Sequence, residues 1–230
     1  LFEKNFKLNL KMKILHCSDL HGRHLNKISD DVDLVINSGD WMPSSNPLSK
    51  EISFQEDWLK TNGQRIKDYL NNKTLLFASG NHDFCDPVPI LSKIGVRIIN
   101  ITDHLYTHKD SGLSFYGFPY IPFIYNHWNN ERELPEMVKE FDSMLETIKD
   151  GGLDQIDVLV AHCPPYGILD KNQEGNSIGN RVLINRIDYC DFAPNYILCG
   201  HVHENSGVVS YNYITISNAA CTQQILEVPT

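Results

Sequence analysis

The chain has 230 residues, of which 41% are hydrophobic and 21% are charged, and its formal net charge is −9 at pH 7. This length suits one large domain that buries a sizeable core, and the negative charge argues against a protein that holds nucleic acid through a broad basic face. No run approaches the roughly 18 apolar residues of a membrane span. Six cysteines without a C-x-x-C pair indicate reduced thiols, so we expect a cytoplasmic protein.

The N-terminal residues lack the apolar segment of a signal peptide. Met12 leads directly into the first apolar run of the chain. We therefore expect residues 1–11 to be an extension outside the core fold and residues 12–230 to form one domain.

Short runs rich in Ile, Leu, Val or Phe recur along the chain, and each ends in a polar or glycine-bearing turn. Their length and composition fit buried strands better than helices. The predicted strands are 13–18, 33–39, 74–80, 113–118, 157–162 and 195–200, and residues 207–220 alternate like an antiparallel hairpin. Helical spacing of apolar residues predicts helices over 50–71 and 131–150. The pattern indicates an α/β fold with strands inside and helices outside.

Five of these strands end in a turn that carries Asp, Asn or His. The residues are Asp19, His21, Asp40, Asn81, His162, His201 and His203. Each piece alone is better explained as an ordinary turn or a structural histidine. Because ligands of open α/β sheets gather at the carboxyl ends of strands, the coincidence of five such turns predicts a single site.

The residue types at these turns specify the chemistry of the predicted site. Two carboxylates, one amide oxygen and four imidazoles form a mixed oxygen and nitrogen set. This set suits Mn, Fe, Co, Ni or Zn, whereas an all-oxygen cage would suit Mg or Ca. Seven ligands exceed the needs of one ion, so we expect two divalent ions, with Asp40 as the candidate bridge between them.

The blocks SDLHGR, GDW, GNHD, VLVAHCPP and GHVHE resemble those of the calcineurin-like metallophosphoesterase superfamily in order and spacing. A closer resemblance is to the small metallophosphoesterase-domain-containing proteins, which are similar to class III cyclic-nucleotide phosphodiesterases. It rests on FQEDWL, GFPYIPFIYNHW, HCPPYGILD, GHVHENSG and ISNAA, and it covers nearly the whole chain from Met12. The resemblance implies an αββα sandwich, with two mixed β-sheets flanked by helices and the metal site at the carboxyl ends of strands.

The resemblance also implies a role for each residue of the turns. One ion would be held by Asp19, His21, Asp40 and His203. The second ion would be held by Asp40, Asn81, His162 and His201. Some relatives have Gly at the position of His201. A water or hydroxide between the ions would attack the phosphorus. His82 would stabilise the transition state or protonate the leaving oxygen. The resemblance favours manganese, with Fe, Zn, Co and Ni as alternatives.

Other residues have two interpretations that the sequence leaves open. Arg23 contacts a phosphate oxygen or lies unpaired on the surface, and Asp83 orients His82 or lies in an exposed turn. The two prolines of segment 117–128 favour a loop. Its aromatic side chains either stack on a nucleobase or pack on the core or another subunit; they are Tyr120, Phe123, Tyr125 and Trp128. Trp41, directly after Asp40, is expected to form another wall of the pocket.

The sequence therefore predicts a two-metal phosphohydrolase that acts on small phosphodiesters such as cyclic nucleotides. A phosphomonoesterase and a non-catalytic scaffold of the same fold are the alternatives. The expected partner is a small phosphorylated substrate, with a nucleotide among the candidates. We expect no stable nucleic-acid complex and no membrane association, and the sequence does not specify the oligomeric state.

Overall fold

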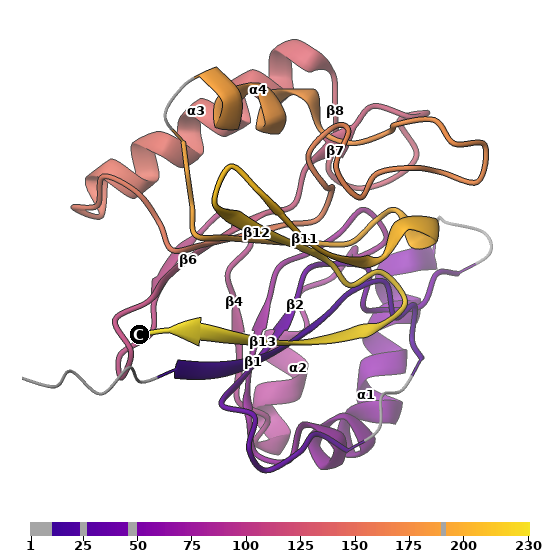
Figure 1. Cartoon of the computed structure of the whole chain (residues 1–230). Helices are drawn as coiled ribbons and strands as arrows, with labels where there is room; N and C mark the ends of the chain where they lie inside the picture. Colours follow the sequence, from indigo (N-terminus) through magenta and orange to yellow (C-terminus); the bar gives the residue numbers. More distant parts are fainter. Residues whose placement is uncertain (1–10, 24–26, 46–49, 190–191) are drawn as a thin grey trace, which may run out of the picture.

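The computed structural model describes residues 11–23, 27–45, 50–189 and 192–230, which form four layers. Two large β-sheets pack face to face, α1 and α2 cover the outer face of one sheet, and α3 and α4 cover the outer face of the other (Figure 1). The predicted class, two mixed sheets flanked by helices, is confirmed. The predicted N-terminal extension falls almost entirely on residues 1–10, outside the described residues, and the first strand begins at Lys11.

The first sheet has the strand order β13-β1-β2-β3-β4. All neighbours are parallel except β13, which runs antiparallel to β1. Its strands are β1 (Lys11–Cys17), β2 (Leu34–Asn37), β3 (Thr74–Phe77), β4 (Ile98–Asn100) and β13 (Gln223–Pro229). The helices on its outer face are α1 (Glu51–Leu70) and the short α2 (Val88–Leu91), which continues into the 3-10 turn η2 (Ser92–Ile94).

The second sheet has the strand order β11-β12-β10-β9-β6-β5. Its four central strands are parallel and its two edge strands are antiparallel to them. In chain order its strands are β5 (Leu105–Thr107), β6 (Ser114–Phe118), β9 (Val158–Ala161), β10 (Tyr196–Cys199), β11 (Gly207–Tyr211) and β12 (Ile214–Asn218). It is covered by α3 (Leu134–Asp150) and α4 (Arg181–Tyr189). The remaining elements are β7 (Ile121–Pro122), its partner β8 (Glu131–Arg132) and the 3-10 turn η3 (His203–Asn205).

The continuous apolar runs of the sequence arise because the central strands are buried on both faces. In β9, Val158 and Val160 contact the core between the sheets, whereas Leu159 and Ala161 contact the core beneath α3 and α4. A strand with two covered faces has no solvent side on which to place polar residues. All six predicted strands are therefore present, and the predicted hairpin is β11 and β12.

The predicted helix over 131–150 begins later than its apolar pattern suggested. Residues 131–132 form β8, and α3 starts at Leu134 with a capping box between Glu133 and Glu136 and a proline in its first turn. These are strong start signals. The helix α4 and the strands β4, β5 and β13 were not predicted from the sequence.

The parallel strands of both sheets direct their carboxyl ends to one edge of the molecule, the edge opposite the marked C-terminus in Figure 1. Below this edge His16 joins the sheets, since its ring nitrogens lie 2.9 Å from the hydroxyl oxygens of Ser217 and Ser38.

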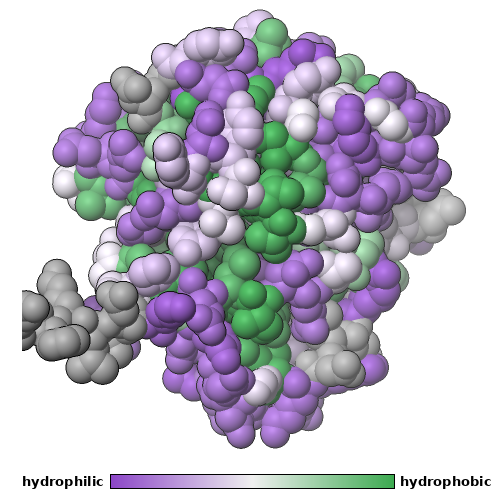
Figure 2. All heavy atoms as spheres, viewed as in Figure 1, coloured by the Kyte–Doolittle hydropathy of each residue, from purple (hydrophilic) through white to green (hydrophobic). Residues whose placement is uncertain are grey.

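Figure 2 shows mostly polar residues on the face viewed, with an apolar strip where β11 and β13 cross it. Within the described residues, no helix combines the length and apolar character needed to cross a membrane.

Candidate metal centre

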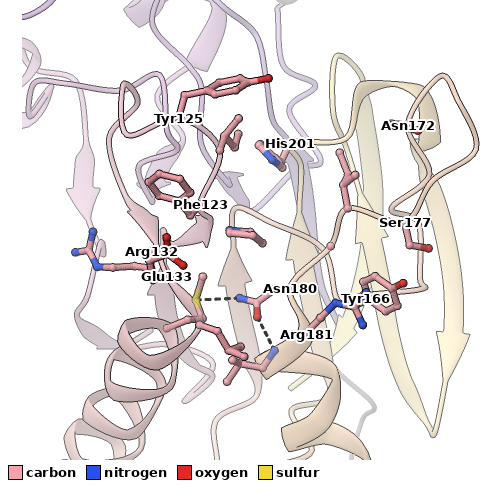
Figure 3. Close-up of a pocket in the computed structure, with 17 residues that line it drawn as sticks. Phe123, Tyr125, Arg132, Glu133, Tyr166, Asn172, Ser177, Asn180, Arg181 and His201 are labelled. Carbon is pink, nitrogen blue, oxygen red and sulfur yellow. Dashed lines mark hydrogen bonds between the residues drawn. The ribbon is translucent and has the colours of Figure 1, made fainter.

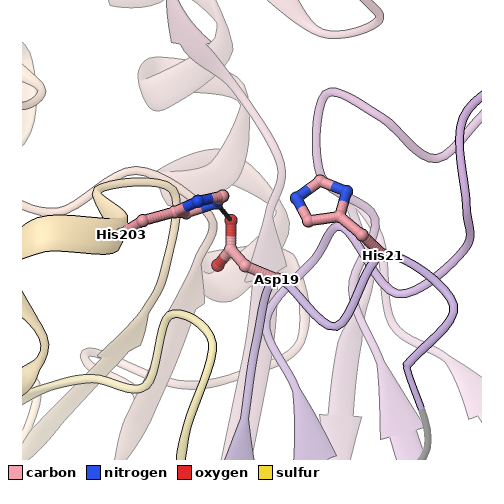
Figure 4. Close-up of side chains that lie close together, drawn as sticks. All are labelled: Asp19, His21 and His203. Carbon is pink, nitrogen blue, oxygen red and sulfur yellow. Dashed lines mark hydrogen bonds and ion pairs between the residues drawn. The ribbon is translucent and has the colours of Figure 1, made fainter.

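The turns after β1 and β10 bring three side chains together. One carboxylate oxygen of Asp19, Oδ1, lies 3.1 Å from Nε2 of His203, and the other accepts a 2.9 Å hydrogen bond from the backbone N–H of His201. His21 completes the group, with its ring centroid 5.4 Å from that of His203 (Figure 4). Asp19, His21 and His203 offer one ligand atom each within 4.8 Å of one another. They are three of the four residues expected to hold the first ion.

Asp40 follows β2 and lies between the two expected ion positions. Its Oδ2 is 3.9 Å from Nε2 of His21 and 3.4 Å from Nε2 of His162. Asp40 is 2% exposed, so water does not compete for this oxygen. Its position between one ligand of each expected ion is the position that a bridging carboxylate needs.

The turns after β3, β9 and β10 supply the rest of the expected set. The amide oxygen of Asn81 lies 2.9 Å from Nε2 of His162 and 3.1 Å from Nδ1 of His201. The rings of the two histidines are 5.1 Å apart, centroid to centroid. The structure thus brings all seven sequence-predicted ligands into one continuous cluster.

A site for a cation needs hydrogen-bond acceptors that are directed at one point, and such acceptors converge in this cluster. Nδ1 of His162 lies 2.8 Å from the carbonyl oxygen of Ser38 and carries the proton of the neutral ring, which leaves a lone pair on Nε2. That lone pair faces the oxygens of Asn81 and Asp40. Buried acceptors in mutual contact repel one another unless positive charge lies between them. The donor set therefore fits divalent metal ions.

The pKa values of the imidazoles agree with this assignment. Burial lowers the pKa of His201 to about 4 and also lowers the pKa of His21, so both rings are neutral at pH 7 and able to bind metal. Burial acts in the same direction on His162, but the charge of Asp40 and its hydrogen bond outweigh it and raise the pKa to about 9. A proton on His162 thus takes the place of a cation, and metal binding there displaces it.

Several ligands hold a backbone conformation that L-residues rarely adopt. Positive φ angles occur at Asp19 (54°), His21 (45°), Asp40 (53°) and His201 (67°). Such conformations cost roughly 1–3 kcal/mol each and persist where the surroundings enforce them. Glycine is required beside them, because a Cβ at Gly80 would overlap Asp40 and a Cβ at Gly200 would overlap Asp19.

His82 lies at the rim of the cluster and is held at three points. Its backbone N–H donates a 2.7 Å hydrogen bond to Oδ1 of Asp40, and its Nδ1 lies 2.8 Å from the hydroxyl of Ser44. The ring is 4.9 Å from that of His21 and stacks on Trp128 at 4.0 Å, centroid to centroid. His82 therefore borders the expected ion positions without a direct place among the ligands.

Asp83 is neither an exposed turn residue nor a partner of the His82 ring. It is 2% exposed, and its carboxylate accepts hydrogen bonds from the backbone N–H groups of Trp41, Met42 and Gly80. Burial and the nearby charge of Asp40 raise the pKa of Asp83 to about 7. Asp83 thus joins the turn after β2 to the turn after β3.

A further buried polar residue was missed by sequence reasoning. Gln55 on α1 is fully buried; its amide donates a 2.6 Å hydrogen bond to the carbonyl oxygen of His82 and accepts one from the N–H of Phe84. The signal was present, because Gln55 occupies the apolar stripe of the helix together with Leu59 and Ile66. A polar residue in such a stripe indicates a buried partner.

Three of the predicted substrate contacts are buried or already form hydrogen bonds within the protein. Arg23 donates to the carbonyl oxygens of Asp19 and Leu20. Trp41 is 1% exposed beneath the cluster, and Tyr120 is buried with its hydroxyl donating to Asp103. We therefore carry forward only the fourth, Trp128, as a candidate substrate contact.

The aromatic loop is organised by one carboxylate that sequence reasoning did not identify. Glu131 is 8% exposed and accepts hydrogen bonds of 2.7 to 3.1 Å from five successive backbone N–H groups, those of residues 124–128. Asn129 and Asn130 then join the loop to the turn after β3, through the carbonyl oxygens of Asp83 and Gly80. The loop is thereby fixed against the metal cluster.

A cavity of about 750 Å³ begins beside the cluster, with His201 in its wall (Figure 3). One side is formed by residues 122–125 of the aromatic loop and by the start of α3. The opposite side is formed by segment 166–182, which includes Tyr166, Asn172 and Arg181. The cavity offers room for a small-molecule group next to the cluster.

Comparison with known proteins agrees with this geometry. A family model for the calcineurin-like phosphoesterases matches residues 12–205. The chain is 25% identical over 222 residues to the UPF0046 protein K07C11.7 and 26% identical over 182 residues to the UPF0046 protein T07D4.2, both of Caenorhabditis elegans. These matches cover 91% and 77% of the chain, and 69% and 42% of the two relatives.

Among solved structures, the fold resembles that of the phosphopantetheinyl hydrolase PptH from Mycobacterium tuberculosis, with a TM-score of 0.51 and 13% identity. The match covers 94% of this chain and 91% of the hydrolase. At this identity the likeness concerns the fold alone.

Replacement of Asp40 by alanine tests the shared ligand. Because Asp40 contacts one ligand of each expected ion, we expect Asp40→Ala to lose both ions together, as measured by elemental analysis of the dialysed protein. The matched control is Asp110→Ala, which removes an exposed carboxylate and should leave the metal content unchanged. An Asp40→Ala protein that keeps one ion at full occupancy would show that Asp40 serves only one position.

Replacement of Glu131 by glutamine tests the anchor of the aromatic loop. An amide keeps one acceptor and turns an NH2 group toward backbone N–H donors, so we expect faster hydrogen exchange at residues 124–128 in Glu131→Gln. Glu146→Gln removes an exposed carboxylate of α3 and should leave this exchange unchanged. Equal protection of the loop in both variants would contradict the role of Glu131.

The same carboxylate makes a pH-dependent contribution to stability. Burial acts to raise the pKa of Glu131, but the backbone N–H groups outweigh it and lower the pKa from 4.5 to about 2. A lowered native pKa stabilises the fold above the unfolded value and loses this effect as pH falls through the native value. The stability difference between the wild type and Glu131→Gln should therefore shrink between about pH 5 and pH 2 in chemical denaturation.

Proposed function

The chain belongs to the calcineurin-like phosphoesterase family, and from this premise we propose a two-metal phosphodiesterase that acts on small phosphodiesters, cyclic nucleotides among them. The family is described as one of phosphoesterases, and all seven expected ligands lie together beside His82, so the scaffold alternative is set aside. One observation carries the preference for diesters. The cavity of about 750 Å³ continues from His201 away from the metal ligands, and a diester has a second ester group to place there, whereas a monoester has none.

The seven side chains of the cluster would hold two divalent ions, with Asp40 shared between them. When bound, such ions supply the positive charge that makes water nucleophilic at neutral pH and offsets the charge of the phosphate in the transition state. Manganese is the metal we propose, with Fe, Zn, Co and Ni compatible with the same donors.

His82 is the residue that we propose as the proton donor to the leaving oxygen. The hydrogen bond from its backbone N–H to Asp40 fixes it beside the cluster. The protonated ring carries an N–H on each nitrogen; Nδ1–H lies 2.8 Å from the hydroxyl oxygen of Ser44, and Nε2–H is the group that passes its proton to the leaving oxygen. Burial lowers the pKa of His82, which makes the protonated ring a stronger acid and returns it to the neutral form after the transfer.

The location that we propose is the cytosol. The five cysteines in the described part of the chain are free thiols; they are Cys17, Cys85, Cys163, Cys199 and Cys221. Free thiols at these positions are compatible with a reducing compartment.

The proposed function is tested by paired substrates on manganese-loaded protein. Bis-p-nitrophenyl phosphate and p-nitrophenyl phosphate release the same chromophore from a diester and a monoester, and 2′,3′- and 3′,5′-cyclic nucleotides extend the series. We expect kcat/KM to be higher for the diester than for the monoester. A preference for the monoester would support the phosphomonoesterase alternative and overturn the proposal.

The role of His82 predicts a dependence on the leaving group. We expect His82→Ala to keep its metal content and to lower kcat for a cyclic nucleotide by roughly 10²–10⁴-fold. The loss should be smaller for bis-p-nitrophenyl phosphate, because p-nitrophenolate leaves without a proton. His104→Ala, at an exposed histidine, is the control. Loss of the metal ions from His82→Ala would show that His82 supports the ligands instead.

A further inference from the structure

The cavity beside His201 has an apolar wall that is open to solvent. Four large apolar side chains, Phe123, Ile124, Tyr125 and Leu134, line it, and Ile178 adds apolar surface on the opposite side; all five are at least 38% exposed. Burial of apolar surface of this kind under a ligand is favourable, because it removes that surface from water. Such a wall next to a metal cluster indicates contact with an apolar or aromatic part of a substrate.

Arg181 places a positive charge on the opposite side of this cavity. Its guanidinium carbon lies 3.7 Å above the centroid of the Tyr166 ring, and within the described residues it forms no ion pair. The other arginine of the cavity, Arg132, is paired with Glu140 at 2.7 Å. Arg181 is therefore the arginine of the cavity whose donors are open to an anion.

The single acidic residue in the described cavity lining does not neutralise Arg181. Glu133 is the N-cap of α3, and its carboxylate accepts the backbone N–H of Glu136. The partial positive charge of a helix N-terminus stabilises a carboxylate in this position. The charge of Glu133 is thus already compensated by its own helix.

The wall that carries Arg181 is held by buried groups. Asp170 is fully buried and accepts hydrogen bonds from the N–H groups of Gly167 and Gly179, at 2.8 and 3.0 Å. Asn180 caps α4 by accepting from the N–H groups of residues 182 and 183. Both segments that contribute to the Tyr166–Arg181 stack are therefore fixed before a ligand arrives, which reduces the entropy lost on binding.

We propose that this cavity is a subsite for the second ester group of the substrate, and that it selects a group with an apolar or aromatic body and a distal anion bound by Arg181. The inference rests on the proposed function, which places the scissile phosphodiester at the metal ions. His201 marks the metal end of the cavity and Arg181 lies away from it (Figure 3). The preferred substrates are thus asymmetric phosphodiesters with a second negative charge, and cyclic nucleotides, which lack a distal anion, fit the subsite less well.

The test uses three diesters that release the same p-nitrophenolate from manganese-loaded protein. They carry a phenyl, a 4-carboxyphenyl or a 4-(phosphonomethyl)phenyl group as the second ester. We expect KM to be about tenfold lower for at least one anionic diester than for the phenyl diester, a difference within the range of one charge-assisted hydrogen-bonded pair. The carboxylate and phosphonate arms show which anion the subsite takes.

Variants of Arg181 separate this subsite from the rest of the site. Arg181→Ala should abolish the preference, so that KM becomes the same for the anionic and the phenyl diester, and should leave the metal content unchanged. Arg181→Lys should retain part of the preference, and Arg181→Gln gives the same test as alanine with a longer side chain. Arg186→Ala, which removes an arginine of the same helix that pairs with Asp142, should keep the preference.

Two results would overturn the inference while leaving the proposed function intact. These are hydrolysis of all three diesters with equal KM, and a preference that persists in both Arg181→Ala and Arg181→Gln. If the metal-loaded wild type hydrolysed p-nitrophenyl phosphate but none of the diesters, the proposed function itself would fail, and the subsite for a second ester group would fail with it.

Discussion

The arrangement at the carboxyl edge of the two sheets depends on positive charge between buried acceptors that face one another. One oxygen of Asp19 and one of Asp40 are satisfied by backbone N–H groups, and the ring of His162 is fixed by the carbonyl of Ser38. The remaining oxygens face the imidazoles of the cluster, where positive charge comes either from a proton, as on His162, or from a metal ion. Binding of metal, loss of that proton and formation of these turns therefore belong to one equilibrium.

The ligand set was predictable because each ligand follows a strand with a readable signal. An apolar run buried on both faces predicts a strand without any knowledge of its neighbours, and parallel strands place their carboxyl ends together. The strand β13 lacked this advantage, since it pairs with β1 from the other end of the chain. No local pattern indicates that pairing.

Asp83, Gln55 and Glu131 were misread or missed for a different reason. Their partners are backbone N–H and carbonyl groups, which occur at nearly every residue and have no identity in a sequence. Only the tertiary fold shows that five such groups point at the carboxylate of Glu131. Sequence motifs thus indicate residues whose own type suits them to bind metal, and they do not identify residues that hold the backbone of a site in place.

The proposed reaction and the proposed subsite use different parts of the molecule. The expected metal ligands lie in turns at strand ends of both sheets, where strain and close packing permit little change. The walls of the cavity belong instead to residues 122–134 and 166–182, braced by the buried carboxylates of Glu131 and Asp170. Substitutions at exposed wall positions such as Tyr125 and Arg181 leave these braces and the ligands intact. A chain built in this way can change the group it accepts while it keeps the reaction, and His201 is the residue at which the two requirements meet.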